Sequence, residues 1–528
     1  MIFAVTEKKQ THKAHGRFPL FFRLFSLLFA LLLLFPNPSQ AITKAALLSK
    51  LFGSLELYIA PQGTTALPLD VKPDHSFSNI VRSAVKYGII LPNQAFSPDA
   101  AATKSEALYL ALCSMGWRFE AGLSQKIGGL QEFAGSGDPI LFMAAEMVPQ
   151  APAALLSGGD EPLSDENVKA LLAWVTLCRR SVVWNRVFSY AGTDLILYRQ
   201  GVGTPGTNKT TAMRQPPLYL AAIAVAPSRV DQSIVFAEPL GRPQLPLSEI
   251  ARSVNAIGAV NGGFFYGGRP IGSLMQNGMP VGKPYPERSA IGWTSSGQAH
   301  FGSGVMKTSI AAPSGKVEIS SYNTPPTEGT ASLYVATVTP TASGLHPDTL
   351  EIYVDNGVVF SKRLASESDH ILPKTGFMIA ARGRSKELLN ELAEGSTIAL
   401  EKEWANTTYS DFSHLIQAGP MLLSNGVAVT ASESFNSSIT EKQHPRTFVG
   451  VDASNRIIWA VMDGRDPMHS MGGTIAETRW IAKSLGMINA LNLDGGGSST
   501  LWWRGIIANK PSDGKERPVP YGITMHSK

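Results

Sequence analysis

The pattern of apolar and polar positions changes near residue 185. From Ile42 to about Arg180, apolar residues recur every three or four positions, which is typical of helices. From Trp184 onward, alternating or β-branched runs are separated by Gly, Pro and Asn turns, which is typical of strands. The pattern predicts a helical region over residues 42–183 and a sheet-dominated domain over residues 184–528. It also predicts that the second folds without the first.

Three predicted helices of the first region begin in the same way. Thr43, Thr103 and Ser164 stand 60 and 61 residues apart, and each precedes an apolar run whose first turn its hydroxyl can cap. Glu106 follows Thr103 by three residues, as a capping box requires. Residues 77–90 predict a further short helix that ends at a Gly-Ile-Ile step.

The second region predicts the clearest strands at residues 218–226, 233–237, 350–354, 447–452 and 457–462, and helices at 247–257, 386–394 and 474–485. Residues 452–456 predict a hairpin turn between the last two strands, and Thr474 with Glu477 predicts a second capping box. The expected fold class is α/β (α+β), a mixed-sheet domain preceded by a small all-α region.

The first 41 residues are typical of an export signal. Five Lys or Arg residues against Glu7 accompany the apolar run 24–35, and Ser39-Gln40-Ala41 places small residues two apart. We expect cleavage after Ala41 and an exported protein, in the periplasm, at the cell surface or secreted. The alternative is an uncleaved anchor, since residues 18–35 nearly span a bilayer.

Composition narrows the class of protein. The 528 residues are 44% hydrophobic and 16% charged, which excludes a disordered polyelectrolyte. The net charge of +5 falls to +1 once the leader is set aside, so nucleic acid is excluded as a partner. Cys113 and Cys178 are too few for a disulfide framework and form either one disulfide or two buried thiols. Residues 201–206 have a dinucleotide-binding spacing, but no helix follows and we interpret them as a loop.

The candidate chemistry lies in four glycine-rich blocks at predicted strand ends. They are Asn261-Gly262-Gly263-Phe264, then Gly419-Pro420, then His444-Pro445-Arg446-Thr447 with Asp463-Gly464-Arg465, and finally Asn492-Leu493-Asp494-Gly495-Gly496-Gly497-Ser498-Ser499. A strand that ends at Asp494 before three glycines exposes a carboxylate beside free N–H groups. This arrangement suits an anion, and the carboxylate suits a general base, a nucleophile or a metal ligand. Each block alone is a glycine-rich turn, but the four together predict a site.

These blocks resemble the phosphodiester glycosidase family over residues 215–525. The resemblance implies an exported hydrolase that cleaves the bond between a sugar C1 oxygen and phosphate, in cell-envelope or exopolysaccharide metabolism. The implied roles are Asp494 and Asp463 as catalytic carboxylates, Arg446 and Arg465 on the phosphate, Asn261 and Asn492 on sugar hydroxyls, and Gly262, Gly263, Gly495, Gly496, Gly497, Ser498 and Ser499 around the substrate.

Some roles stay open at this point. At most one of Trp502 and Trp503 faces the site, because neighbours on a strand point to opposite sides. His444 is either an acid or phosphate ligand, or a loop residue. No cofactor is certain, and a divalent cation at Asp463 or Asp494 has no ligand spacing to support it.

Residues 42–183 resemble the S-layer homology domain, through the Gly-Ile-Ile step, the turn at Phe96-Ser97-Pro98 and the helix start at Thr103. The resemblance implies binding of anionic cell-wall polysaccharide. Lys104 replaces the usual Arg and Ala46 the usual Glu, so the alternative is a helical spacer.

Two functions remain for the whole chain. One is the exported hydrolase, and the other is a non-catalytic polysaccharide-binding or assembly protein of the cell envelope. The presence of Arg446, Asp463, Arg465 and Asp494 favours the enzyme, since a binder would not need charges of both signs beside the glycines.

Overall fold

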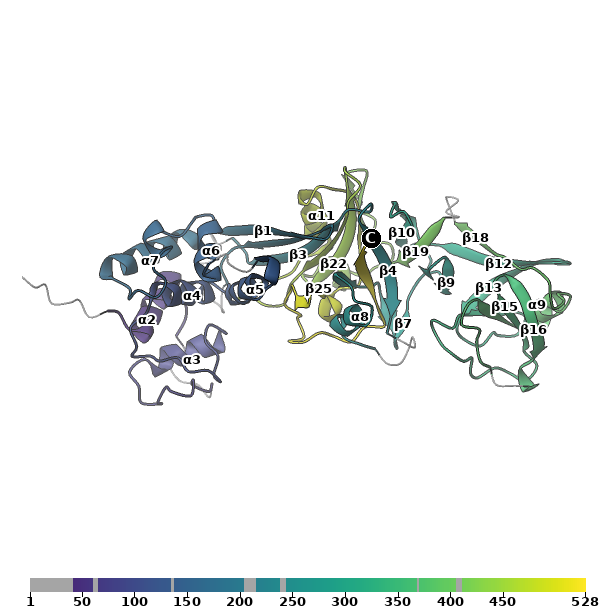
Figure 1. The fold of residues 1–528 in the computed structure, drawn as a ribbon, viewed down its shortest axis with the longest axis horizontal. Helices are drawn as coiled ribbons and strands as arrows, with labels where there is room; N and C mark the ends of the chain where they lie inside the picture. The colour runs from purple at the N-terminus through teal and green to yellow at the C-terminus, as the bar shows by residue number, and fades with distance from the viewer. Residues whose placement is uncertain are drawn as a thin grey trace, which may run out of the picture.

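The computed structural model describes residues 41–59, 65–133, 137–203, 215–237, 244–367, 370–404 and 411–528. Three parts follow one another along the long axis: the N-terminal helices, a central part of layered sheets, and a lobe at the far end (Figure 1). The predicted export signal lies outside the described residues, apart from Ala41. Within the described ranges, no helix has the length and apolar character needed to span a membrane.

The N-terminal part contains helices at the four predicted positions and two more, α5 (Arg118–Gly128) and α6 (Pro139–Glu146), that were not predicted. The predicted four are α2 (Lys44–Leu55), α3 (Ser78–Lys86), α4 (Lys104–Ser114) and α7 (Asp165–Cys178). Thr43, Thr103 and Ser164 cap α2, α4 and α7 as predicted, and Glu106 completes the capping box at α4. The caps satisfy N–H groups that a helix start leaves unpaired. Cys113 and Cys178 are buried free thiols, and burial raises the pKa of each to about 12.

The central part is built from two antiparallel sheets. The larger has the order β1 (Val183–Tyr190), β2 (Thr193–Gln200), β3 (Leu218–Val225), β23 (Ile457–Met462), β22 (Arg446–Asp452), β24 (Met487–Asn492), β20 (Met421–Ser424), β21 (Val427–Ala428). The smaller has the order β26 (Ile506–Ile507), β25 (Leu501–Trp503), β5 (Gly258–Asn261), β27 (Tyr521–Ser527), β4 (Val230–Phe236).

Alternation along β3 explains how these sheets stack. Tyr219, Ala221 and Ile223 belong to the core shared with the smaller sheet, whereas Leu220 and Ala222 belong to a second core cluster on the other face, which includes residues of α11 (Ile475–Ser484). A strand with both faces buried is apolar throughout, as the run 218–225 is. Helix α8 (Leu247–Ser253) covers the outer face of the smaller sheet. The central part therefore has four layers, in the order helix, sheet, sheet, helix.

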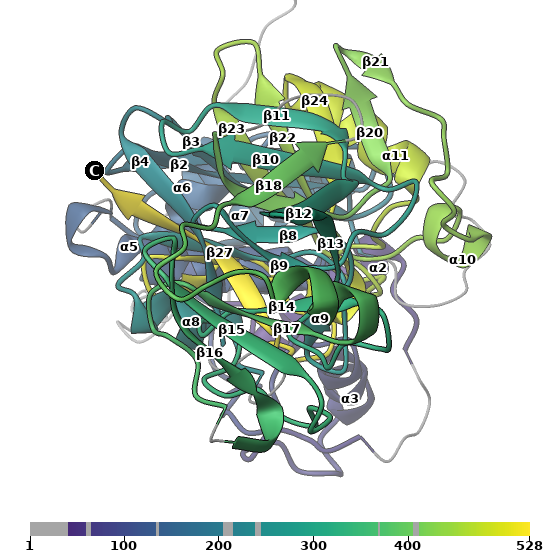
Figure 2. The same cartoon turned by 90° about the vertical axis from the view of Figure 1, so that its right-hand side faces the viewer.

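The lobe is inserted between β11 and β19 and ends in a sheet of its own (Figure 2). The connecting sheet has the order β11 (Ala299–Ser303), β10 (Ser289–Thr294), β19 (Phe412–Gln417), β8 (Leu274–Gln276), β9 (Met279–Gly282). The lobe sheet has the order β16 (Val358–Leu364), β15 (Leu350–Asp355), β17 (Phe377–Ala381), β14 (Ala331–Tyr334), β13 (Gly315–Tyr322), β12 (Met306–Ala312), β18 (Leu400–Trp404), and α9 (Gly383–Leu389) packs on it. Two short elements, the hairpin β6 (Phe265–Tyr266) and β7 (Arg269–Pro270) and the helix α10 (Ser437–Thr440), border the central part.

The predicted strands and helices of this region are confirmed, with two changes in helix length. Helix α8 ends at Ser253 rather than at residue 257, and Asn255 there has a left-handed φ of 50° that a helix cannot contain. Helix α9 spans residues 383–389 rather than 386–394. Thr474 and Glu477 form the predicted capping box at α11.

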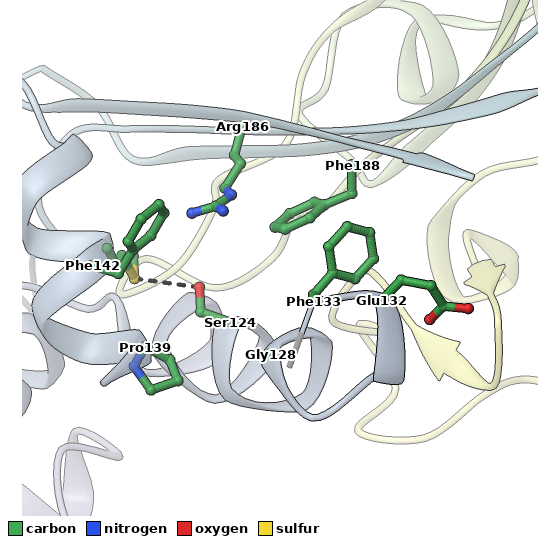
Figure 3. Close-up of a pocket in the computed structure, with 9 residues that line it drawn as sticks. Ser124, Gly128, Glu132, Phe133, Pro139, Phe142, Arg186 and Phe188 are labelled. Carbon is green, nitrogen blue, oxygen red and sulfur yellow. Dashed lines mark hydrogen bonds between the residues drawn. The ribbon is translucent and has the colours of Figure 1, made fainter. Parts of the chain in front are cut away.

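The helices pack closely on the hairpin β1–β2. Arg186 of β1 lies over the rings of Phe142 and Phe188, at 4.1 and 4.7 Å, and these side chains line a cavity of about 300 Å³ (Figure 3). The Trp117 indole donates a hydrogen bond of 2.9 Å to the carbonyl of Gly201. The change of pattern near residue 185 therefore marks a change of structure type, and the two types of structure pack on each other there.

Candidate active site

The loop after β24 carries the carboxylate that the sequence singled out. Asp494 stands two residues beyond the end of β24, and its Oδ1 accepts a hydrogen bond of 3.0 Å from Gly495 N–H. Burial raises the pKa of the Asp494 carboxyl to about 6, although Gly495 and the positive charge of Arg517 both act to lower it. A carboxyl with a pKa near neutrality can exchange a proton with a reacting group at physiological pH.

Two exposed arginines lie against the glycines that follow Asp494. A side-chain carbon placed on Gly497 would lie 2.0 Å from Arg517 Nη2, and one on Gly496 would lie 3.0 Å from Arg465 Nη2. Gly496 also has a φ of 64°, which favours glycine. The loop that follows the Asp494 carboxylate therefore has a guanidinium group against each of two successive glycines. Guanidinium groups beside N–H groups form a site for an anion.

Arg517 was missed by sequence reasoning. It lies in a polar loop before β27 and forms an ion pair of 2.8 Å with Asp513. Neither residue belongs to a glycine-rich block, and only the folding of β27 beside β5 brings the loop to Gly497.

Arg446 is buried, and its hydrogen bonds go to backbone carbonyls rather than leaving the guanidinium open to a phosphate group. Its Nε donates to Gly473 O at 2.8 Å, and its Nη2 donates to Ile439 O and Lys442 O at 2.6 and 2.9 Å. Burial lowers the pKa of its guanidinium to about 10, and the nearby charge of Arg465 acts in the same direction. The geometry therefore assigns it to holding α10 and the loop before α11.

Asp463 is also buried, with 1% of its surface exposed. His469 Nε2 lies 2.8 Å from its Oδ2, which also accepts a hydrogen bond of 2.7 Å from Lys510 N–H. Asn509 Nδ2 donates to its Oδ1 at 2.8 Å. Both oxygens are occupied, so the contacts favour a positioning role over attack on a substrate.

The two predicted asparagines hold the backbone of the site together. Asn261 Nδ2 donates to Asp494 O at 2.9 Å, and its Oδ1 accepts from Thr447 and Thr500. Asn492 Nδ2 donates to Gly419 O at 2.9 Å, which joins two of the predicted blocks. Both asparagines are 1% exposed, so their amides fix loops and do not face a sugar.

The first block packs on Tyr521. A side-chain carbon on Gly262 would lie 2.2 Å from the Tyr521 ring, and Gly263 N–H donates to the Tyr521 hydroxyl at 2.9 Å. Burial raises the pKa of Tyr521, and the charge of Asp494 contributes. The block therefore lies behind Asp494, where it supports the loop.

The remaining predicted residues also contact other parts of the protein. His444 Nδ1 accepts from Arg465 Nη2 at 3.4 Å and its Nε2 lies 2.9 Å from Ser438 O, so it orients Arg465. Trp502 and Trp503 are both buried in the core, and neither offers a face to a ligand. Ser498 and Ser499 are buried too, and the Ser499 hydroxyl lies 3.2 Å from that of Thr447.

A second group that sequence reasoning missed surrounds Arg288. Its guanidinium lies 3.9 Å from the Tyr285 ring and 4.3 Å from the Phe435 ring, and Phe435 pairs with Phe264 of the first block at 5.4 Å. The Arg288 Nε is buried without a hydrogen-bond partner. These residues come from distant parts of the chain, so no local motif marks them.

A metal centre is not evident in the described parts of the chain. Among these residues, no three His, Cys, Asp or Glu side chains gather in a way that could hold an ion. Asp463 and Asp494, the two residues considered as metal ligands, bond instead to the groups given above.

Comparison with known proteins links the site to one family. Residues 348–526, about a third of the chain, match the family model described as phosphodiester glycosidase. The match contains Arg446, Asp463, Arg465, Asp494 and Arg517, whereas the first block lies outside it. A curated relative, the SPbeta prophage-derived uncharacterized protein YomE of Bacillus subtilis, is 37% identical over 83 residues, which are 16% of this chain and 13% of that protein. This chain thus matches a small part of that relative's length.

Two solved structures share the fold over about two thirds of this chain, and a third is more distantly similar. A hypothetical protein from Synechocystis matches 66% of this chain and 75% of its own, with a TM-score of 0.50 and 21% identity. An exported-protein candidate from Burkholderia pseudomallei matches 65% of this chain and 96% of its own, with a TM-score of 0.50 and 18% identity. The catalytic domain of zebrafish N-acetylglucosamine-1-phosphodiester alpha-N-acetylglucosaminidase, auto-inhibited by its pro-peptide, matches 66% of this chain and 88% of its own, with a TM-score of 0.37 and 14% identity.

Proposed function

We propose, from the match of residues 348–526 to the phosphodiester glycosidase family, that this protein hydrolyses glycosyl-1-phosphodiesters at Asp494. The observation that carries the proposal is the Asp494 carboxyl, whose pKa is raised to about 6 beside two guanidinium groups. A binding protein gains nothing from a carboxyl tuned to exchange protons, so this observation favours the enzyme over the polysaccharide-binding alternative.

The reaction needs one base and a site for negative charge. Water attacks the sugar C1 and forms a new C–O bond, while the bond between C1 and the phosphate oxygen breaks. The proton of the water passes to the Asp494 carboxylate, and the phosphate monoester leaves with the bonding electron pair. A phosphate monoester leaves readily as an anion, so one carboxylate acting as base is sufficient, and an attack by Asp494 itself followed by hydrolysis gives the same products.

Arg465 and Arg517 supply the positive charge for the leaving group. Their guanidinium groups lie on the 495–497 loop, and a guanidinium group can donate two parallel hydrogen bonds to phosphate oxygens. Arg517 would exchange its present partner, Asp513, for the phosphate. Charge on the phosphate grows as the C1–O bond breaks, so these bonds strengthen in the transition state and lower the barrier.

The test is an assay of purified full-length protein on a panel of sugar-1-phosphodiesters. Asp494→Asn should lower kcat by about a hundredfold or more, because an amide cannot accept the proton. Asp231→Asn, which changes an exposed carboxylate on β4, is the matched control and should keep parental activity.

A melting curve separates catalysis from stability. Burial raises the pKa of the Asp494 carboxyl above its value in the unfolded chain. Ionising the carboxyl therefore destabilises the folded protein, and this destabilisation develops as pH rises from about 4 to about 6. Asp494→Asn removes this cost and should melt no lower than the parent at pH 7. A stable Asp494→Asn variant with near-parental turnover would show that the active site is elsewhere.

The place of action is part of the same proposal. The leader at residues 1–41 supports export, and export favours a substrate in the cell envelope or in exopolysaccharide. N-terminal sequencing of the exported protein should begin at Ile42. Binding of cell-wall polysaccharide by residues 42–183 remains a prediction, which a pull-down of the full-length protein with purified cell wall tests.

A further inference from the structure

A buried chain of charged groups joins the N-terminal helices to the central sheets. Glu120 of α5 has no exposed surface, and its Oε1 lies 2.7 Å from Arg199 Nε and 3.2 Å from His469 Nδ1. The other nitrogen of His469, Nε2, lies 2.8 Å from Asp463 Oδ2. The ring of His469 packs against Phe119 and Tyr219, at centroid distances of 5.2 and 5.0 Å, and these two rings also contact each other at 5.4 Å. The imidazole therefore has a carboxylate near each nitrogen and two aromatic rings packed against it.

The same chain continues from Asp463 to the glycine-rich loop. Asp463 accepts hydrogen bonds from Asn509 Nδ2 and from Lys510 N–H. Asn509 Nδ2 also donates to Ser499 O at 3.1 Å, and Asn509 Oδ1 accepts from Leu501 N–H at 2.8 Å. Because Ser499 ends the loop that begins at Asp494, the position of Asp463 fixes one end of that loop.

Protonated His469 fits this arrangement. The Nε2 of His469 hydrogen-bonds Asp463, and its Nδ1 lies 3.2 Å from Glu120 Oε1, so two carboxylates flank the ring and favour the positively charged imidazolium. Burial acts to lower the pKa of His469, but the charges of Glu120 and Asp463 prevail and raise it. The other charged groups around the chain are Arg199, which pairs with Glu120, and Asp466, which pairs with Lys510 Nζ at 2.8 Å. Loss of the Glu120 charge would remove one of the two reasons for His469 to stay protonated.

We propose that Glu120 is a positioning residue of the Asp494 site, which it supports through His469 and Asp463 from outside the part of the chain that matches the glycosidase family. The helices then complete the enzyme rather than merely tether it. This inference rests on the proposed function for its effect on turnover, but its effect on the loop is independent of any substrate.

The kinetic experiment compares two glutamates, each of which pairs an N-terminal helix with a strand of the central sheet. Glu120→Gln keeps the shape of the side chain and removes its charge. Glu146→Gln makes the same change in α6. Glu146 pairs with Arg186 of β1 at 2.8 Å and lies outside the network of buried charged groups that contains Glu120. Since small displacements of reacting groups cost about 10- to 100-fold in rate, Glu120→Gln should lower kcat by about tenfold or more with KM nearly unchanged, and Glu146→Gln should lower neither.

The structural arm is amide hydrogen exchange on the full-length protein. The Lys510 N–H, which bonds to Asp463, and the Leu501 N–H, which bonds to Asn509, should exchange faster in Glu120→Gln and at the parental rate in Glu146→Gln. If Glu120→Gln does not fold, Glu120→Asp keeps the charge at a shorter reach, and it should show smaller changes in both arms.

The two proposals fail in different ways. A parent without turnover on any phosphodiester would overturn the proposed function, while faster exchange confined to the Glu120 variant would still support positioning. Parental exchange at Leu501 and Lys510 in a folded Glu120 variant would overturn the positioning role, as would equal losses in the Glu120 and Glu146 variants.

Discussion

Glu120 of α5 and Arg199 of β2 form an ion pair of 2.7 Å, and neither side chain has any exposed surface. The two residues come from opposite sides of the change in sequence pattern near residue 185. Breaking a buried pair by removing one partner costs about 3–5 kcal/mol, because the other charge is left without compensation. The pair is thus a strong reason for the helices and the sheets to fold together.

This contact changes what we expect of the fragment 184–528. The sequence pattern predicts that it folds alone, but without the helices Arg199 and His469 lose Glu120, and Tyr219 and Trp503 lose their contacts with Phe119 and Phe133. We expect the fragment to be insoluble or to melt well below the full-length protein. Circular dichroism melts of the two proteins measure this, and a fragment with parental melting and turnover would restore the first prediction.

The pKa of Asp494 predicts the pH profile. If the carboxylate is the base, kcat/KM should be constant above about pH 7 and should fall as pH drops through about 6, where the carboxyl takes up a proton. The profile is measured from pH 4.5 to 8.5 with a substrate whose phosphate does not titrate there. The residual rate of Asp494→Asn should lack this step. A parental rate that increases towards low pH would show that the protonated form acts, as a general acid.

The two exposed arginines should matter for phosphate and little for stability. Arg465→Ala and Arg517→Ala should each lower kcat/KM for phosphodiesters by about 10- to 100-fold, since hydrogen bonds to charged groups contribute about 1.5–3 kcal/mol. Arg456→Ala, at the β22–β23 turn, removes another arginine that is 45% exposed and should have no effect. The loss should shrink on aryl glycosides that lack phosphate, and an equal loss on both substrate classes would contradict phosphate binding.

Arg446 should affect stability first. Lysine has one nitrogen where Arg446 uses two to reach Gly473, Ile439 and Lys442, so Arg446→Lys leaves at least one buried carbonyl without its partner. We expect a loss of about 1–3 kcal/mol in the free energy of unfolding. Chemical denaturation measures it, with Arg252→Lys on α8 as the control. Unchanged stability with a specific loss on phosphodiesters would instead assign Arg446 to the substrate.

Most of the secondary structure could be predicted from short-range patterns in the sequence. Thr103 and Glu106 mark a helix start because their hydrogen bonds are made within one turn, and the capping box at Thr474 forms for the same reason. The strand 218–225 could be predicted because it is buried on both faces and apolar throughout. The end of α8 at Ser253 was harder to predict, since it depends on a single left-handed residue, Asn255.

The site was only partly accessible to the sequence because a polar residue's role depends on what it faces. Asp494 and its glycines could be singled out because a carboxylate before three glycines has few structural uses, and the structure places two of these glycines against Arg465 and Arg517. Arg446 and Asn261 stand in equally suggestive blocks, yet their hydrogen bonds go to backbone or to Thr447. Glu120 and Arg517 escaped notice because nothing near them in the chain signals the distant partners that burial supplies.

The way in which the lobe joins the central part bears on how such proteins can diversify. The lobe leaves after β11 and returns at β19, and both strands pair with β10. At the base of the lobe Met306 pairs with Trp404, which closes the insertion like a stem. An inserted lobe whose two ends are neighbours can grow, shrink or be exchanged during evolution without changing the order of the strands that position Asp494. The lobe can therefore change without a change in the strands that position Asp494.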